Sequence, residues 1–185
     1  MLVLALAPVL SGAALSGPVP VRCIVATSLF SPESFRAYPA GPVWNGTPKA
    51  PDTRFGEAHR FRTVLHAEAK GPPDFAGHYK VVTHGCGAGL ACPMFVDLQT
   101  GRVQQVSSLA SIEVDYARAY EVEKAIGIAD TRLVYRSDSR LLVALGTRNE
   151  NPKLAGATLY EWTDRGPHLR RFIPENKLCR GKDSL

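Results

Sequence analysis

Residues 75–103, FAGHYKVVTHGCGAGLACPMFVDLQTGRV, constrain the fold more than any other part of the chain. Two short apolar runs, at residues 79–83 and 94–98, flank a glycine-rich turn that holds Cys86 and Cys92. A second turn, at residues 97–101, leads into a third run at 102–107. Short apolar runs separated by glycine-rich and Asp-containing turns are typical of β-hairpins. The segment therefore predicts a three-stranded antiparallel meander.

The same pattern continues toward the C-terminus. Residues 133–145 predict two strands around a tight turn at 137–139, and residues 157–162 and 169–173 predict two more. The acidic stretch at residues 112–130, between the meander and these strands, is less regular, and we expect a partial helix at residues 116–125. We therefore expect an α+β fold, a mostly antiparallel β meander of six or seven strands with one packed amphipathic helix.

That helix is predicted for residues 53–69. Apolar side chains recur there at steps of three and four residues, and Gly71, Pro72 and Pro73 follow. The stripe consists of Phe55, Ala58, Phe61, Val64, Leu65 and Ala69. Because an apolar stripe must be covered, we expect the helix to lie on a face of the meander that follows it.

The N-terminal region divides into two parts. Residues 1–16 are almost entirely apolar, too short to span a bilayer, and end in a small-x-small pattern, so we interpret them as a cleaved signal peptide. Residues 17–51 are rich in proline and glycine and predict an extended arm, anchored by Phe35, Tyr38 and Trp44. Residues 52–185 then form a single β-rich domain. This organisation predicts a periplasmic or secreted protein that does not span the membrane.

Four cysteines follow the predicted signal, and in an exported chain they favour two disulfides over free thiols. Of the three possible pairings we favour Cys86 with Cys92 and Cys23 with Cys179, because the first closes a local loop and the second ties the chain ends. On a chain-entropy model the short loop contributes about 2 kcal/mol and the long one about 5 kcal/mol.

Two histidines near these cysteines raise the question of metal binding. His78 and His84 are six residues apart and would share one face of an extended strand. The Cys-x5-Cys spacing is looser than that of structural zinc sites, and an oxidising compartment favours the disulfide. We expect no metal and no cofactor. A metal-binding protein or hydrolase centred on His78 and His84 remains the alternative.

The acidic residues do not form a recognisable catalytic pair. Asp97 and Asp138 lie beside turns, where a carboxylate accepts hydrogen bonds from backbone amides, and Glu161 is expected to alternate outward between two aromatic residues. No serine lies in a nucleophile elbow. Enzymatic activity is therefore undecided and not favoured.

Charge gives the one indication of a partner. The net charge is +5, and residues 165–182 carry six basic side chains against Glu175 alone. Such a basic surface attracts an acidic protein or an anionic envelope component, whereas nucleic acid is not expected for an exported chain. The candidate binding surface comprises His78, Tyr79, His84, Arg165, Arg170 and Arg171.

Several motifs together resemble a family of small exported bacterial proteins without an assigned activity. They are FAGHY at 75–79, HGCG at 84–87, VDLQTGRV at 96–103, YRSDSRLL at 135–142 and YEW at 160–162. The resemblance covers most of residues 51–173 and implies export and a β-rich fold, without catalytic residues. The order of strands and turns is also similar to β-propeller blades, although two such units are too few to close a propeller.

Taken together, these features predict an exported, non-enzymatic binding protein. A rigid sheet with a disulfide-braced loop lowers the ordering cost of binding, as in inhibitors and immunity-type proteins.

Overall fold

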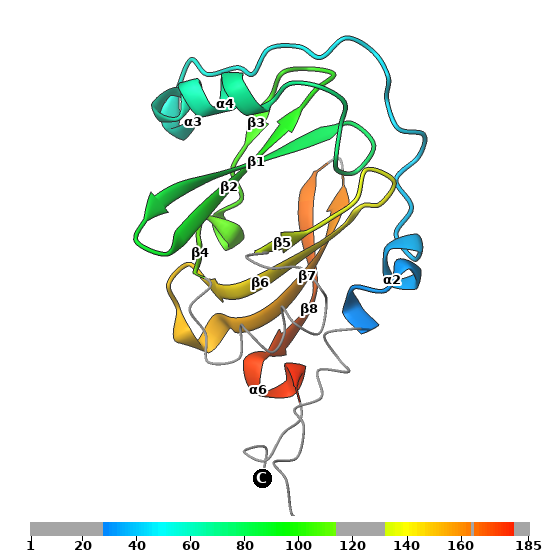
Figure 1. Ribbon diagram of the computed structural model, residues 1–185, viewed down its shortest axis with the longest axis vertical. Helices are drawn as coiled ribbons and strands as arrows, with labels where there is room; N and C mark the ends of the chain where they lie inside the picture. Colours follow the sequence, from blue (N-terminus) through cyan, green and yellow to red (C-terminus); the bar gives the residue numbers. More distant parts are fainter. Residues whose placement is uncertain (1–27, 114–131, 164, 180–185) are drawn as a thin grey trace, which may run out of the picture.

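The computed structural model describes residues 28–113, 132–163 and 165–179. It contains one antiparallel sheet with strand order β1-β2-β4-β6-β7-β8, with β3 beside β2 and β5 beside β6 (Figure 1). The α+β class and the antiparallel meander are confirmed, whereas the open sheet is not a propeller. The strands are β1 Tyr79–Gly87, β2 Leu90–Asp97, β3 Val103–Gln104, β4 Ile112–Glu113, β5 Leu133–Val134, β6 Leu141–Arg148, β7 Ala155–Thr163 and β8 Gly166–Pro174.

The sheet is narrow at β4, which has only two residues and joins a β1–β3 half to a β5–β8 half. The close approach of β4 to β6 requires a glycine. Gly146 has a φ of 125°, and a Cβ there would lie 2.2 Å from the carbonyl oxygen of Glu113. A larger residue would force the two strands apart.

Buried side chains of the described residues form three apolar clusters against the sheet. Alternate residues of β6 serve different clusters, because successive side chains of a strand point to opposite faces. Leu142 and Ala144 join Phe75, Phe95 and Trp162 in a central cluster that draws on both halves of the sheet. The opposite face of β6 contributes to a second cluster, with Leu141, Val143, Leu145, Leu29, Phe35, Ile173 and Leu178. A third cluster joins Val82, Met94 and Val96 to Leu65 and Ala69.

The predicted helix at residues 53–69 is two short helices, α3 (Gly56–Arg60) and α4 (Arg62–Glu68). The break is at Phe61, whose backbone (φ −103°, ψ 21°) leaves the helical region and whose ring lies on His84. Leu65 is fully buried, as the stripe predicts, but Phe55 is 78% exposed. The part of this segment that packs on the sheet therefore begins after Phe55, later than the apolar stripe predicts.

The described part of the arm follows the outside of the molecule (Figure 1). It contains a short helix, α2 (Pro32–Arg36), whose N-terminus is capped by the Ser31 side chain. Beyond it, the backbone amide of Trp44 donates to the carbonyl of Gly77, and that of Lys49 donates to the carbonyl of Leu98. These bonds fix this part of the arm to the β1–β3 half of the sheet, and the bond from the amide of Ala40 to the carbonyl of Asp138 attaches it beside the β5–β8 half.

A disulfide joins Cys86 to Cys92, as predicted. The cysteines lie within β1 and β2 and not in a loop, because the strand pairing continues to Gly87 and Leu90. Cys86 is the extra residue of a bulge, since Gly85 pairs with Ala91 and Gly87 with Leu90. Cys179 is also disulfide-bonded, whereas its predicted partner, Cys23, lies outside the described residues.

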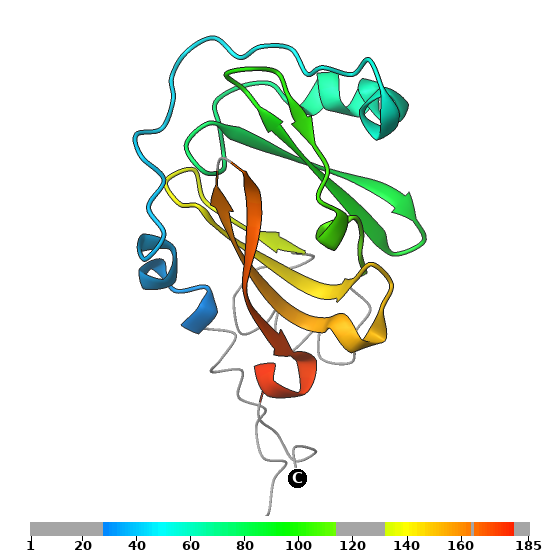
Figure 2. The same cartoon turned by 180° about the vertical axis from the view of Figure 1, so that it is seen from behind.

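Several predicted features cannot be placed. The signal peptide (1–16), the start of the arm (17–27) and the partial helix (116–125) lie outside the described residues. β8 leads into the C-terminal helix α6 (Glu175–Leu178), as Figure 2 shows. Among the helices that are described, none has the length and apolar character needed to cross a membrane.

Candidate functional site

An open pocket of about 270 Å³ lies where the arm meets the FAGHY turn and the β6–β7 pair. Residues far apart in the sequence build it: three from the arm, four from the FAGHY turn and β1, and three from the starts and ends of β6 and β7. The lining consists of Ala40, Gly41, Pro42, Ala76, Gly77, His78, Tyr79, Arg140, Trp162 and Thr163.

The FAGHY turn forms one wall of this pocket. Ala76 and Gly77 have φ angles of 45° and 82°, a region that alanine rarely adopts. The turn is held in place because Ala76 and Gly77 donate backbone hydrogen bonds to the carbonyls of the 136–139 turn. An unfavourable backbone conformation persists where the surrounding structure determines it, and such conformations cluster at functional sites.

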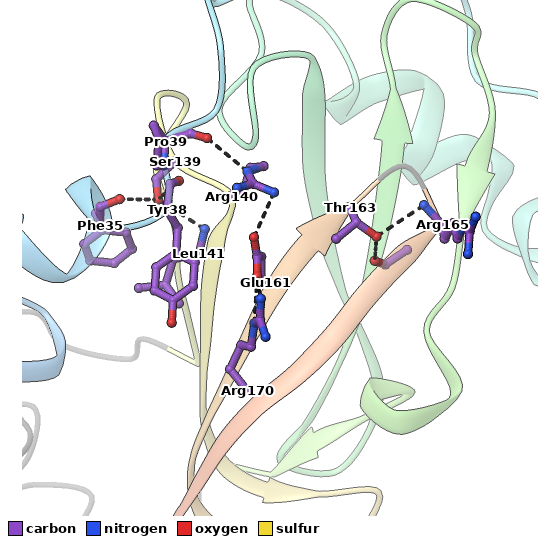
Figure 3. Close-up of polar contacts among 11 residues, drawn as sticks. Phe35, Tyr38, Pro39, Ser139, Arg140, Leu141, Glu161, Thr163, Arg165 and Arg170 are labelled. Atoms are coloured by element: carbon purple, nitrogen blue, oxygen red, sulfur yellow. Dashed lines mark hydrogen bonds and ion pairs between the residues drawn. The ribbon is translucent and has the colours of Figure 1, made fainter.

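The YRSDSRLL motif supplies the opposing side through Ser139 and Arg140. The Ser139 hydroxyl is buried, lies 2.8 Å from the carbonyl oxygen of Phe35 and accepts a hydrogen bond from the amide of Leu141 (Figure 3). The amide of Arg140 donates to the carbonyl of Tyr38 at 2.7 Å. The motif therefore attaches the arm to the sheet and places Arg140 at the pocket.

Glu161 holds Arg140 in position. Its Oε1 lies 2.8 Å from the Arg140 guanidinium, its Oε2 pairs with Arg170 on β8, and Arg140 Nε also donates to the carbonyl of Pro39 (Figure 3). Glu161 was expected to point outward, and this prediction is wrong: the residue is only 7% exposed. Two arginine side chains cover Glu161, so the face of β7 that carries it is buried, like the face that carries Tyr160 and Trp162. The three residues together carry one excess positive charge.

Aromatic side chains form the apolar part of the site. Trp162 lines the pocket and contacts Phe75, Tyr79 and Phe95, with ring centroids 5.2, 5.4 and 4.3 Å away. The His78 ring lies 4.4 Å from that of Tyr79. Trp162 is almost fully buried, so the wall that it forms is held by packing on several sides.

The structure brings together some of the predicted binding residues and separates others. His78 and Tyr79 line the pocket, and Arg170 is linked to it through Glu161. Arg165 lies in a different, open groove, and Arg171 is exposed on β8. His84 is buried against Phe61, away from the surface, with ring centroids 3.6 Å apart.

His84 is buried as an uncharged group. Neither ring nitrogen has a hydrogen-bond partner, and burial lowers the pKa of the imidazole below its usual 6.5, partly opposed by the charges of Glu57 and Glu68. Within the described ranges, no group of three or more His, Cys, Asp or Glu side chains could hold a metal ion.

Sequence reasoning missed three residues of the site, namely Arg140, Trp162 and Glu161 in its buried role. The resemblance motifs SDSR and YEW contain all three, so an arginine directly after a predicted turn was the available signal. It was not used, because nothing in the sequence shows that residue 140 faces residue 161.

Comparisons with protein families, with curated proteins and with solved structures gave no match. The resemblance to small exported proteins therefore stays a prediction, and the geometry above carries the functional argument.

Proposed function

We propose that this protein is an exported, non-enzymatic binding protein of the inhibitor or immunity type, and that it recognises its partner through the pocket at the FAGHY turn. The observation that carries the proposal is Arg140, a guanidinium held at the pocket by the buried Glu161. Arginine and aromatic residues that are fixed before binding are the groups that dominate recognition surfaces.

The fixed geometry of the pocket supports this proposal. The arm, the FAGHY turn and the 136–139 turn are joined by backbone hydrogen bonds, and Trp162 is packed among other aromatic rings. A preformed pocket loses little conformational entropy when a partner binds, which raises affinity for a given contact area. The disulfide between Cys86 and Cys92 is compatible with an oxidising compartment.

The chemistry of the lining indicates what the pocket accepts. Arg140 and His78 can donate hydrogen bonds, Tyr79 and Trp162 provide apolar walls, and the lining includes no carboxylate. A carboxylate-bearing side chain from a partner protein fits this combination, because a guanidinium forms charge-assisted hydrogen bonds with a carboxylate. The volume is suited to one side chain and not to a large ligand.

The test is an affinity purification from periplasmic extract of the source organism, with the oxidised protein as bait. A matched bait carries Arg140→Gln, and a control bait carries Arg54→Gln, whose guanidinium is exposed and paired with Asp52 outside the pocket. We expect a protein that the wild type and the Arg54→Gln bait retain and that the Arg140→Gln bait loses. Recovery of the same proteins on all three baits would contradict the proposal.

The alternative, a metal protein or hydrolase centred on His78 and His84, receives less support from the geometry. His78 lines the pocket, whereas His84 is buried against Phe61. No observation among the described residues favours this function over binding.

A further inference from the structure

A second depression, an open groove of about 460 Å³, lies between the segment after β3 and the turn that begins β8. It shares no lining residue with the pocket at the FAGHY turn. Its lining comprises Arg102, Val103, Gln104, Gln105, Val106, Ser107, Ser108, Arg165, Gly166 and Pro167. Two arginines, two carboxamides and two hydroxyls therefore face one space.

Among the described residues, none forms a hydrogen bond or ion pair with the polar side chains of this groove. Neither Arg102 nor Arg165 forms an ion pair with a carboxylate of the described chain. Arg102, Gln105, Ser107, Ser108 and Arg165 are exposed, and the lining contains no acidic residue. Positive charge without an internal counter-ion attracts an anion.

The wall that carries the two serines is held from behind. Asn149 donates from its Nδ2 to the carbonyl of Ser107 and accepts from the amide of Ala110. The carbonyl of Ser108 accepts from the buried Arg148 and from the Tyr160 hydroxyl. Because the backbone carbonyls are occupied, the wall offers a ligand its side chains and keeps a fixed shape.

The geometry points to a binding site for an acidic saccharide in this groove. The two guanidiniums suit the carboxylates of the ligand, since charge-assisted hydrogen bonds are the stronger kind. Carboxamides and hydroxyls both donate and accept, which matches the hydroxyl groups of a sugar ring. The groove, of about 460 Å³, is open to solvent, so a longer saccharide can extend beyond the residues that line it. The inference does not rest on the proposed protein partner.

Calorimetric titration at low salt tests this site with three probes. They are a galacturonate oligosaccharide, a neutral maltose oligosaccharide of the same length, and a glutamate oligopeptide of the same charge. We expect the galacturonate oligomer to bind more tightly than either of the others, because only that probe offers both carboxylates and hydroxyls.

Variants then locate the binding. Arg102→Gln and Arg165→Gln are each expected to weaken binding of the galacturonate oligomer by about tenfold. Arg36→Gln, on the exposed surface of α2 and outside the groove, serves as the control and is expected to bind as the wild type does. Circular dichroism and thermal melting establish that the variants fold.

Three results would overturn the inference. One is equal binding of the glutamate peptide, which would show that the protein responds to charge alone. Another is equal binding of the neutral saccharide. The last is undiminished binding by folded Arg102→Gln and Arg165→Gln proteins, which would place the saccharide elsewhere.

Discussion

Glu161 is a buried carboxylate shared by two arginines, Arg140 directly before β6 and Arg170 on β8. The side chains of Arg140 and Arg170 are 39% and 52% exposed, whereas that of Glu161 is 9% exposed. Because the arginine side chains reach water, the solvent screens part of the interaction. The carboxylate itself is the desolvated member of the group. The pocket geometry thus depends on one acidic residue.

Glu161→Gln is expected to lower the free energy of unfolding by about 1–2 kcal/mol, since the buried hydrogen bonds lose their charge assistance. Urea denaturation at neutral pH measures this loss. The matched variant Asp52→Asn removes an exposed pair with Arg54 and should have a much smaller effect. Equal losses in the two variants would refute the assigned role of Glu161.

A second residue-scale prediction concerns His84. Burial lowers the pKa of His84 in the folded protein, so the unfolded chain binds a proton that the folded chain does not. Stability should therefore fall as the pH drops below about 6.5, the usual pKa of the unfolded imidazole. His84→Phe, which can still pack on Phe61, should remove part of this pH dependence.

Urea denaturation of both proteins between about pH 7.5 and pH 5.5 tests this directly. The substitution His168→Gln, of an exposed histidine on β8, provides the comparison for removing an imidazole at the surface. An unchanged pH dependence in His84→Phe would show that His84 is not the group responsible.

Among the elements, the β1–β2 hairpin is closed by the disulfide near its end, beyond the part that packs against the core. Its inner residues Val82 and Met94 are buried, whereas Gly85, Cys86 and Gly87 are exposed. The disulfide therefore ties the exposed end of β1 to Cys92, which is buried on β2.

The double substitution of Cys86 and Cys92 by alanine is expected to cost about 2 kcal/mol of stability. Hydrogen exchange should quicken at residues 85–91, while the amides of β6 and β7 serve as an internal reference that changes only with global stability. Uniformly faster exchange with no local component would contradict a local role for the disulfide.

The strands that the sequence revealed are those with clear boundaries. Residues 141–145 are apolar and follow a turn, which identified them as a strand. The structure adds that this strand, β6, is buried on both faces. Ile112 and Glu113 form β4, but two residues are too few to show a period. The break at Phe61 coincides with a ring contact to His84, and no local pattern indicates that contact.

The candidate site was only partly predictable for a similar reason. SDSR was predicted as a turn, because serine and aspartate mark turns locally, whereas FAGHY was noted only as a motif of the resemblance. Their meeting depends on backbone hydrogen bonds from Ala76 and Gly77 to the 136–139 turn. Pairings across some sixty residues of chain are a property of the fold and leave no trace in local composition.

For the molecule as a whole, β8 is one of the two outer strands in the main strand order of the described sheet, the other being β1, and an outer strand is where copies could associate. β8 is nine residues long and pairs on one side with β7. Two prolines, a bulge at Arg170 and the charge of Arg171 all hinder the addition of another strand. Like charges on two such strands would repel each other.

We therefore expect a monomer, which light scattering after gel filtration measures. Arg171→Val, placed beside the exposed Leu169, should increase self-association by removing a protective charge. A wild-type protein that is dimeric at every accessible concentration would contradict this description of β8.

The account depends above all on the pocket at the FAGHY turn being the surface that a partner protein contacts. The most direct measurement is calorimetric titration of the purified partner into the wild type, Arg140→Gln and Arg54→Gln. We predict an affinity about tenfold lower for Arg140→Gln and unchanged for Arg54→Gln. Equal affinities for all three folded proteins would show that the partner binds elsewhere.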